Sequence, residues 1–171
     1  MDLSIYLQDF KEQQNPSFEE IQLWIQEIEK APRLIKSSVV DLQDEQLDKS
    51  YREGGWTIRQ IVHHMADSNL NAYWRFKRTL TEESPLIPSY NQNKLAELVD
   101  YKEPIDESVQ LIEIIYARFL ILLRKMEPSD YKRTMNSEYF GVMSLEKALQ
   151  RYVWHDRHHL AQIELAKVNG C

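Results

Sequence analysis

Only four glycines interrupt this chain of 171 residues. Between them lie long segments in which apolar side chains recur every three or four residues, which is the period of a helix with one buried face. Such a pattern favours helices over sheets, and we predict an all-α fold. The length suits one domain with its own hydrophobic core, so residues 1–171 are predicted to form a single domain.

Signals for helix ends divide the chain into four helices. Ser17 and Glu20 have the spacing of a capping box, as have Thr57 and Gln60. One helix should therefore begin directly after Ser17 and another directly after Thr57. The first helix should kink or restart at Pro32. The other expected limits are about Ile58–Thr79 for the second helix, about 106–126 for the third and Ser144–Gly170 for the fourth.

The second and third helices are joined by a long segment, residues 84–104, which contains three prolines and no sustained helical period. We interpret it as an ordered connection that crosses the bundle and is long enough to form the rim of a pocket. The simplest arrangement is a four-helix bundle with this long connection between the second and third helices.

The third helix is apolar on nearly all sides between Leu111 and Leu123. A single bundle covers only part of such a helix, so we predict a homodimer that buries some of Ile112, Ile115, Phe119 or Leu122. The alternative is that the N-terminal segment and the long connection cover this helix within one chain.

The charge composition argues against a nucleic-acid partner. Acidic residues number 27 against 21 lysines and arginines, and the net charge of -6 leaves no basic surface for phosphates. The single cysteine, Cys171, cannot form an internal disulfide, which fits a reducing compartment. The sequence shows neither a secretory leader nor an apolar run of membrane length, so we expect a cytoplasmic protein without a membrane partner that acts on a small molecule.

The five histidines form two clusters, IVHHMADS with His63 and His64, and WHDRHH with three more. On a helical wheel His159 falls within the apolar stripe of the fourth helix, and His155 lies at its edge one turn away. The remaining histidine of that cluster points away from these two. In the second helix His64 borders the apolar stripe, whereas His63 is expected to face solvent and to hydrogen-bond to Asp67.

Two imidazoles at positions i and i+4 lean the same way and suit one metal ion, and a facing helix of a bundle can supply a third ligand. We therefore predict that His64, His155 and His159 bind one divalent ion per chain and leave a fourth position open. The alternative is a set of buried histidines that are hydrogen-bonded to neighbours, because this spacing also arises by chance. Since imidazole binds metal only when neutral, metal affinity should weaken as the pH falls through about 6.

Polar residues beside these histidines indicate a wet cavity. Ser68, Asn71 and Arg75 continue a polar stripe along the second helix and are candidates for substrate contacts. Asp156 lies in the apolar stripe of the fourth helix, where an ionised carboxylate is unfavourable unless it is paired. It should either orient a metal ligand or form a salt bridge to Arg75 or Arg78.

Two segments, GGWTIRQIVHHMADSNLNAYWRFKRTLTEESP and SLEKALQRYVWHDRHHLAQI, resemble the DinB-like metalloproteins, most closely their YfiT branch. The resemblance spans nearly the whole chain. It implies a four-helix bundle that holds one divalent ion, zinc in the first place and nickel as the alternative, on one histidine of the second helix and two of the last. In this sequence those are His64, His155 and His159. Where many relatives have a further histidine, this chain has Asn69 and Gln162.

The same resemblance implies a metal-dependent hydrolase, and the alternative activity is transfer of a low-molecular-weight thiol such as bacillithiol to electrophiles. In either case the ion would activate the nucleophile, water or thiol, and the ligands do not discriminate between them. Arg75 and Arg157 could hold the carboxylates of an acidic thiol co-substrate, and surface salt bridges explain these two arginines equally well. A third interpretation is a non-catalytic metal-binding stress-response protein, in which Asp156 or Glu138 would close the fourth position.

Overall fold

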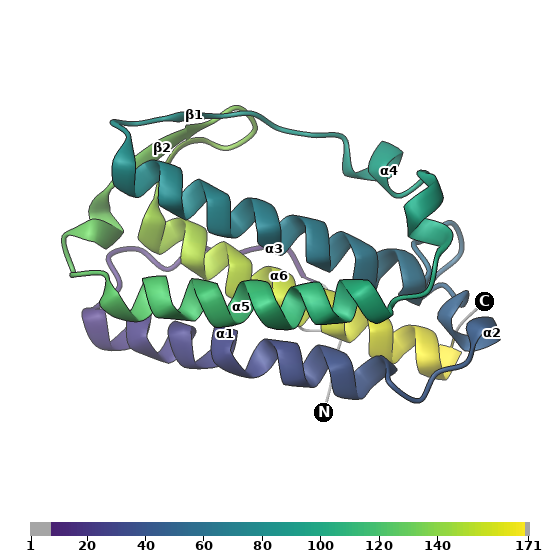
Figure 1. Ribbon diagram of the computed structural model, residues 1–171. Coiled ribbons are helices and arrows are strands. Elements are labelled where there is room, and N and C mark those ends of the chain that lie inside the picture. Colours follow the sequence, from purple (N-terminus) through teal and green to yellow (C-terminus); the bar gives the residue numbers. More distant parts are fainter. Residues whose placement is uncertain (1–7, 170–171) are drawn as a thin grey trace.

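Four long helices lie side by side in the computed structural model, which describes residues 8–169 (Figure 1). They are α1 (Phe18–Val39), α3 (Ile58–Thr81), α5 (Asp106–Lys125) and α6 (Leu145–Asn169). α1 and α3 each pack against both α5 and α6, so α1 and α3 occupy opposite corners of the bundle. The predicted four-helix bundle is confirmed. Within residues 8–169, no helix has the length and apolar character that a bilayer crossing demands.

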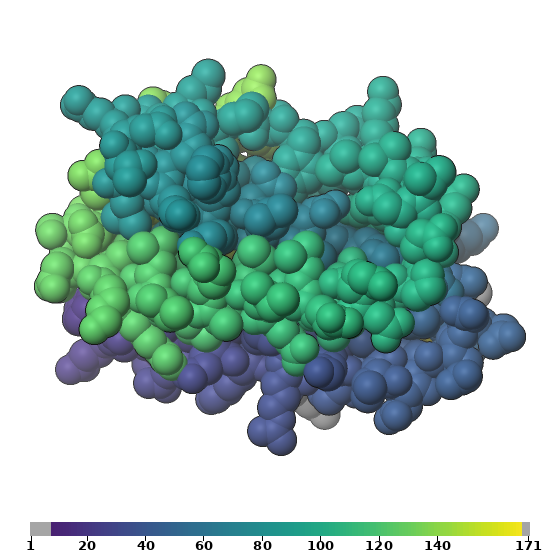
Figure 2. All heavy atoms as spheres, viewed as in Figure 1, coloured from purple at the N-terminus to yellow at the C-terminus, as the bar shows by residue number. Residues whose placement is uncertain are grey.

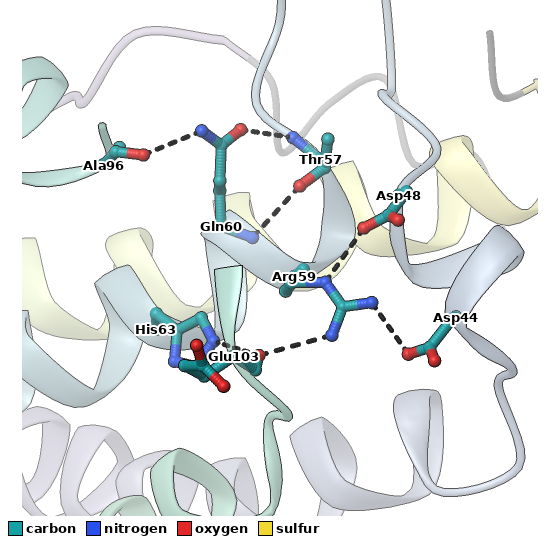
Figure 3. A network of polar contacts seen from close by, with 8 residues as sticks. All are labelled: Asp44, Asp48, Thr57, Arg59, Gln60, His63, Ala96 and Glu103. Atoms are coloured by element: carbon teal, nitrogen blue, oxygen red, sulfur yellow. Dashed lines mark hydrogen bonds and ion pairs between the residues drawn. The ribbon is translucent and has the colours of Figure 1, made fainter. Parts of the chain in front are cut away.

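Both predicted capping boxes are present. The Ser17 hydroxyl accepts a hydrogen bond from the backbone N–H of Glu20, whose carboxylate accepts one from the N–H of Ser17. Thr57 and Gln60 repeat this arrangement at the start of α3 (Figure 3). The expected restart at Pro32 does not occur, and α1 is continuous through it. The proline nitrogen cannot donate one backbone hydrogen bond, but buried residues on both sides hold the helix on the core.

The predicted ends of the long helices are close to the observed ones. α3 ends at Thr81, slightly beyond the predicted Thr79, and α6 begins at Leu145 instead of Ser144. The predicted stop at Gly170 lies outside the described residues, as does Cys171.

The apolar faces of the four helices form one core, which also contains residues predicted to lie in a dimer interface. Ile112, Ile115 and Phe119 are buried within the chain itself, because α5 packs against both α1 and α3. The interface prediction is therefore wrong for these three residues. α5 instead exposes Ile114 and Ile121, which are 59% and 67% accessible.

The long connection between α3 and α5 is present as predicted and runs back along the bundle (Figure 1). It contains β1 (Leu86–Ile87), α4 (Gln92–Leu95) and the 3-10 helix η2 (Val99–Lys102). A second 3-10 helix, η3 (Asp130–Lys132), follows α5.

A small three-stranded sheet was not predicted. β1 pairs in parallel with β2 (Thr134–Ser137), and β2 pairs antiparallel with β3 (Gly141–Ser144). The positive φ of 70° at Gly141 suits the tight turn between β2 and β3. These strands have two to four residues each, too few for an alternating pattern to identify them.

A buried arginine fixes the start of α3 against the preceding turn, which contains the short helix α2 (Asp44–Leu47). The guanidinium of Arg59 forms ion pairs with Asp44 at 2.8 Å and Asp48 at 2.9 Å. It also donates a hydrogen bond to the backbone carbonyl of Glu103, at the end of the long connection (Figure 3). The first turn of α3, which precedes His64, is thus held from several sides.

Candidate metal centre

α3 and α6 pack against each other and bring the two histidine clusters together. The Nε2 atom of His155 lies 3.1 Å from Nε2 of His64 and 3.1 Å from Nε2 of His159. One ring nitrogen from each of the three lies within 4.8 Å of the others. The predicted grouping is therefore present, with one histidine from α3 and two from α6.

The spacing of these three nitrogens fits a metal ion. Nitrogen ligands about 2.1 Å from a tetrahedral zinc ion stand roughly 3.4 Å from one another. Hydrogen bonding among the rings explains the cluster less well, since Nε2 of His155 has two nitrogen neighbours but only one proton or one lone pair to offer.

The hydrogen bonds of His159 fix its tautomer. Its Nδ1 lies 2.8 Å from the side-chain oxygen of Gln162, which can only accept, so Nδ1 carries the proton and Nε2 presents a lone pair to the cluster. The amide nitrogen of Gln162 donates to Nε2 of His158 at 3.0 Å. Gln162 therefore orients a candidate ligand, a role that the sequence did not reveal.

Burial keeps the three rings neutral near pH 7. It lowers the pKa of His64 to about 4. The pKa values of His155 and His159 are held well below the ordinary range by burial first and then by neighbouring positive charge. Neutral imidazoles are the form that binds metal, so the donor set is ready at physiological pH.

The histidines lie on the wall of a cavity of about 1190 Å³. Other parts of its lining come from residues 88–97 of the long connection, from the β2–β3 turn, from α6 and from Asp9 and Phe10. Trp56 covers one side of the cluster, with its ring 4.7 Å from that of His64. The prediction that the connection forms a pocket rim is confirmed.

No fourth His, Cys, Asp or Glu completes the cluster among residues 8–169. Glu138, which was considered as a closing ligand, instead accepts hydrogen bonds from the backbone and hydroxyl of Ser89. The described residues would therefore offer three protein ligands to an ion on the cavity wall, the number typical of catalytic rather than structural sites.

Asp156 is buried on a different side of α6 from the histidines. Its Oδ1 accepts a hydrogen bond of 2.6 Å from the Tyr116 hydroxyl, and its Oδ2 is buried without a partner in the described chain. The predicted salt bridge to Arg75 or Arg78 is wrong, and the carboxyl does not orient a metal ligand. Burial raises the pKa of Asp156 to about 7, which favours the neutral acid.

His63 is buried, contrary to the prediction that it faces solvent. Its Nδ1 lies 2.7 Å from the Ser108 hydroxyl, and its Nε2 lies 3.1 Å from the backbone carbonyl of Glu103 (Figure 3). Asp67, the predicted partner, accepts a hydrogen bond from Tyr101 instead. The start of α5 and the end of the long connection cover this face of α3.

The structure divides the predicted substrate contacts into two groups. Ser68 and Arg75 line the cavity together with His64. Asn71 is absent from the lining and donates its amide hydrogen bond to the backbone carbonyl of Asp67. Arg157 forms an ion pair with Glu27 of α1, away from the cavity. The placement of Asn71 and Arg157 at the cavity is therefore wrong.

A cavity residue that the sequence analysis missed is Arg151, which lies one turn before His155 on α6. The i, i+4 spacing of Arg151 and His155 could have indicated this shared face.

Comparisons with known proteins agree with this architecture. The model of the DinB superfamily matches residues 27–163. A protein of Oceanobacillus iheyensis, provisionally named a metal-dependent hydrolase, is 51% identical over 140 residues that cover 82% of this chain and 81% of that protein. A protein of Bacillus mycoides with the same provisional name is 45% identical over 143 residues, which cover 84% of this chain and 83% of that protein.

Solved structures show the same fold. YfiT from Bacillus subtilis superposes with a TM-score of 0.91 at 40% identity, covering 98% of this chain and 97% of that one. It is described as a probable metal-dependent hydrolase with an unusual four-helix bundle topology. A second four-helix bundle protein, TT2238, matches with a TM-score of 0.57 at 19% identity, which supports the fold alone.

Proposed function

This chain belongs to the DinB superfamily, and from that premise we propose that it is a metal-dependent hydrolase of small molecules. The observation that carries the proposal is the convergence of three Nε2 atoms, from His64, His155 and His159, on the wall of a large cavity. A divalent cation bound there would supply Lewis-acid chemistry, which lowers the pKa of a water molecule and polarises the bond to be broken.

The residues of the chain would prepare this site in three ways. Burial keeps the donor rings neutral, as their lowered pKa values indicate. Gln162 holds the proton of His159 on Nδ1, so that the opposite nitrogen faces the site. Trp56 packs over two of the rings and keeps bulk water from that side. Zinc is the ion we propose first, with nickel as the alternative, because imidazole donors suit both.

Elemental analysis of the purified protein tests the metal. We expect about one divalent ion per chain after incubation with zinc and desalting. The ion should be lost in His155→Ala, which removes the donor that contacts both others. Less than a tenth of an ion in the wild-type protein would overturn the proposal.

Turnover by the loaded protein tests the reaction. Simple activated esters should be hydrolysed by the zinc-loaded wild type, and neither by the chelator-treated protein nor by His155→Ala. A parallel assay with a thiol and an electrophile distinguishes thiol transfer, for which the names of the relatives offer no support. A loaded protein that turns over neither substrate would favour the non-catalytic metal-binding alternative.

A further inference from the structure

Two arginines that line the cavity form no ion pair with a carboxylate among residues 8–169, although Glu12, which pairs with Lys147, is near enough to act on Arg151. Arg75 comes from α3 and Arg151 from α6, and neither forms an ion pair within the described part of the chain. By contrast, the arginines that form ion pairs with aspartate or glutamate are Arg59, Arg78, Arg124 and Arg157. A partly buried guanidinium without a counter-ion is unfavourable unless something else compensates its charge.

Both arginines line the cavity on whose wall the three histidines lie, and Arg75 is eleven residues beyond His64 on α3. Arg151 precedes His155 by four residues, a rise of about 6 Å along a helix. Nη1 of Arg75 is 3.4 Å from the hydroxyl of Tyr152, the residue that follows Arg151. The guanidinium groups therefore act on the same part of the cavity.

Aromatic rings hold these guanidinium groups from their faces. The central carbon of Arg151 is 3.8 Å from the ring centre of Phe140 and 4.7 Å from that of Phe10. The central carbon of Arg75 is 5.9 Å from the ring centre of Tyr90. Stacking of this kind orients the planar group and leaves its N–H donors available at the edge. The arrangement suits bidentate recognition of a planar or tetrahedral anion.

The charge of the cavity is opposite to that of the protein. The whole chain carries a formal net charge of -6. The charged cavity residues other than histidine are three arginines and two acids, Arg52, Arg75, Arg151, Asp9 and Glu97. Local positive charge on an acidic protein attracts anions to this opening and repels cationic molecules.

We propose that Arg75 and Arg151 form an anion subsite that holds a carboxylate or phosphate group of a small substrate beside the three-histidine centre. The role of the subsite in holding a substrate rests on the proposed function, whereas the binding of an anion by the two arginines does not depend on it. The subsite would place the rest of the substrate toward His64, His155 and His159. The opposing interpretation is that stacking on aromatic rings makes both arginines purely structural.

Anion binding is tested on the full-length protein after chelator treatment, so that no metal ion contributes. Isothermal titration with succinate, with inorganic phosphate and with neutral succinamide at pH 7.5 compares the probes. We expect succinate or phosphate to bind at least tenfold more tightly than succinamide, and the better anion identifies the preferred group. Equal affinity for the anions and succinamide would overturn the subsite.

Variants assign the binding to the two arginines. Arg75→Gln and Arg151→Gln should each weaken anion binding at least tenfold, and Arg151→Lys should restore part of the loss because it keeps the charge. Arg33→Gln is the matched control, since Arg33 is exposed on α1 and does not line the cavity. Thermal unfolding checks that each variant is folded. If Arg151→Gln does not fold, Arg75→Gln decides, and unchanged anion affinity in this variant would overturn the proposal.

The two proposals fail in different ways. If the zinc-loaded protein does not hydrolyse esters but binds anions in a way that depends on the two arginines, the proposed function fails and the subsite stands. If neutral esters are hydrolysed and the arginine variants bind anions like the wild type, the function stands and the subsite fails.

Discussion

His63 and His64 are neighbours in sequence, but the structure gives them different surroundings. His64→Ala should abolish binding of the divalent ion, because it removes one of three donors. His63→Ala should keep the ion but lower the free energy of unfolding by about 1–3 kcal/mol, since it removes a buried ring together with its contacts to Ser108 and Glu103. Elemental analysis and urea denaturation measure the two effects. If His63→Ala loses the ion and His64→Ala keeps it, the ligand has been assigned to the wrong histidine.

Gln162 offers a test of how His159 is oriented. Gln162→Leu removes the acceptor for the Nδ1 proton of His159 and should weaken metal affinity by about 10- to 100-fold. Gln162→Glu retains an acceptor and is the control, expected to stay within a few-fold of the wild type. Competition with a chromogenic chelator gives the affinities. Equal affinity in the Leu variant would mean that the contact does not orient the ligand.

The pH dependence of metal binding follows from the pKa values of the donor rings. The sequence alone suggests that affinity falls near pH 6, the range of an unperturbed histidine. Burial lowers the pKa of His64 to about 4 and holds those of His155 and His159 well below the ordinary range. Protons should therefore compete only weakly at pH 5, with affinity lost as the pH falls toward 4. Titration calorimetry at pH 7, 6 and 5 checks this, and a steep loss between 7 and 6 would contradict it.

At the scale of elements, the Tyr116–Asp156 hydrogen bond joins α5 to α6 in the middle of the bundle. The folded-state pKa of Asp156, about 7, is above its ordinary value, so the fold binds a proton that the unfolded chain releases. This contribution to stability is present at low pH and declines as the pH rises toward 7.

Asp156→Asn keeps an oxygen acceptor for Tyr116 and cannot ionise. The stability of this variant relative to wild type should rise by roughly 2–3 kcal/mol between pH 5 and pH 8. Urea denaturation of both metal-free proteins at the two pH values gives the difference between their free energies of unfolding. The histidines titrate in both proteins, so their effects cancel in this difference. A difference that does not change with pH would show that Asp156 is ionised throughout.

At the scale of the whole molecule, α5 forms a green band across one face, with α3 and the long connection on one side of it and α1 on the other (Figure 2). Its exposed Ile114 and Ile121 are seven residues apart, which places them on the same side of the helix. We expect this face to form the predicted homodimer, in place of the buried residues first assigned to it.

Sedimentation at tens of micromolar should therefore show a dimer. Ile121→Asp should dissociate it while leaving the fold intact, because this side chain is 67% accessible in the single chain. Val168→Asp, at an exposed apolar position on α6, is the control and should remain dimeric. A wild-type protein that sediments as a monomer would remove the prediction.

Features that depend on local geometry could be predicted from the sequence. The capping boxes at Ser17 and Thr57 mark the starts of α1 and α3, because each uses atoms only three residues apart. The shared face of His155 and His159 follows from the helical repeat alone. The grouping of these two with His64 was also predicted, since in a bundle only inward faces of facing helices can meet.

The contacts of a side chain beyond its own helix depend on how the helices and connections pack together. A helical wheel gives the direction of a residue but not the element that lies there. The burial of His63 depends on residues 103–108, and the state of Asp156 depends on Tyr116 of α5. Arg157 lies beside α1, where it forms an ion pair with Glu27. These outcomes depend on contacts between residues that are distant in the chain, and no local pattern in the sequence encodes them.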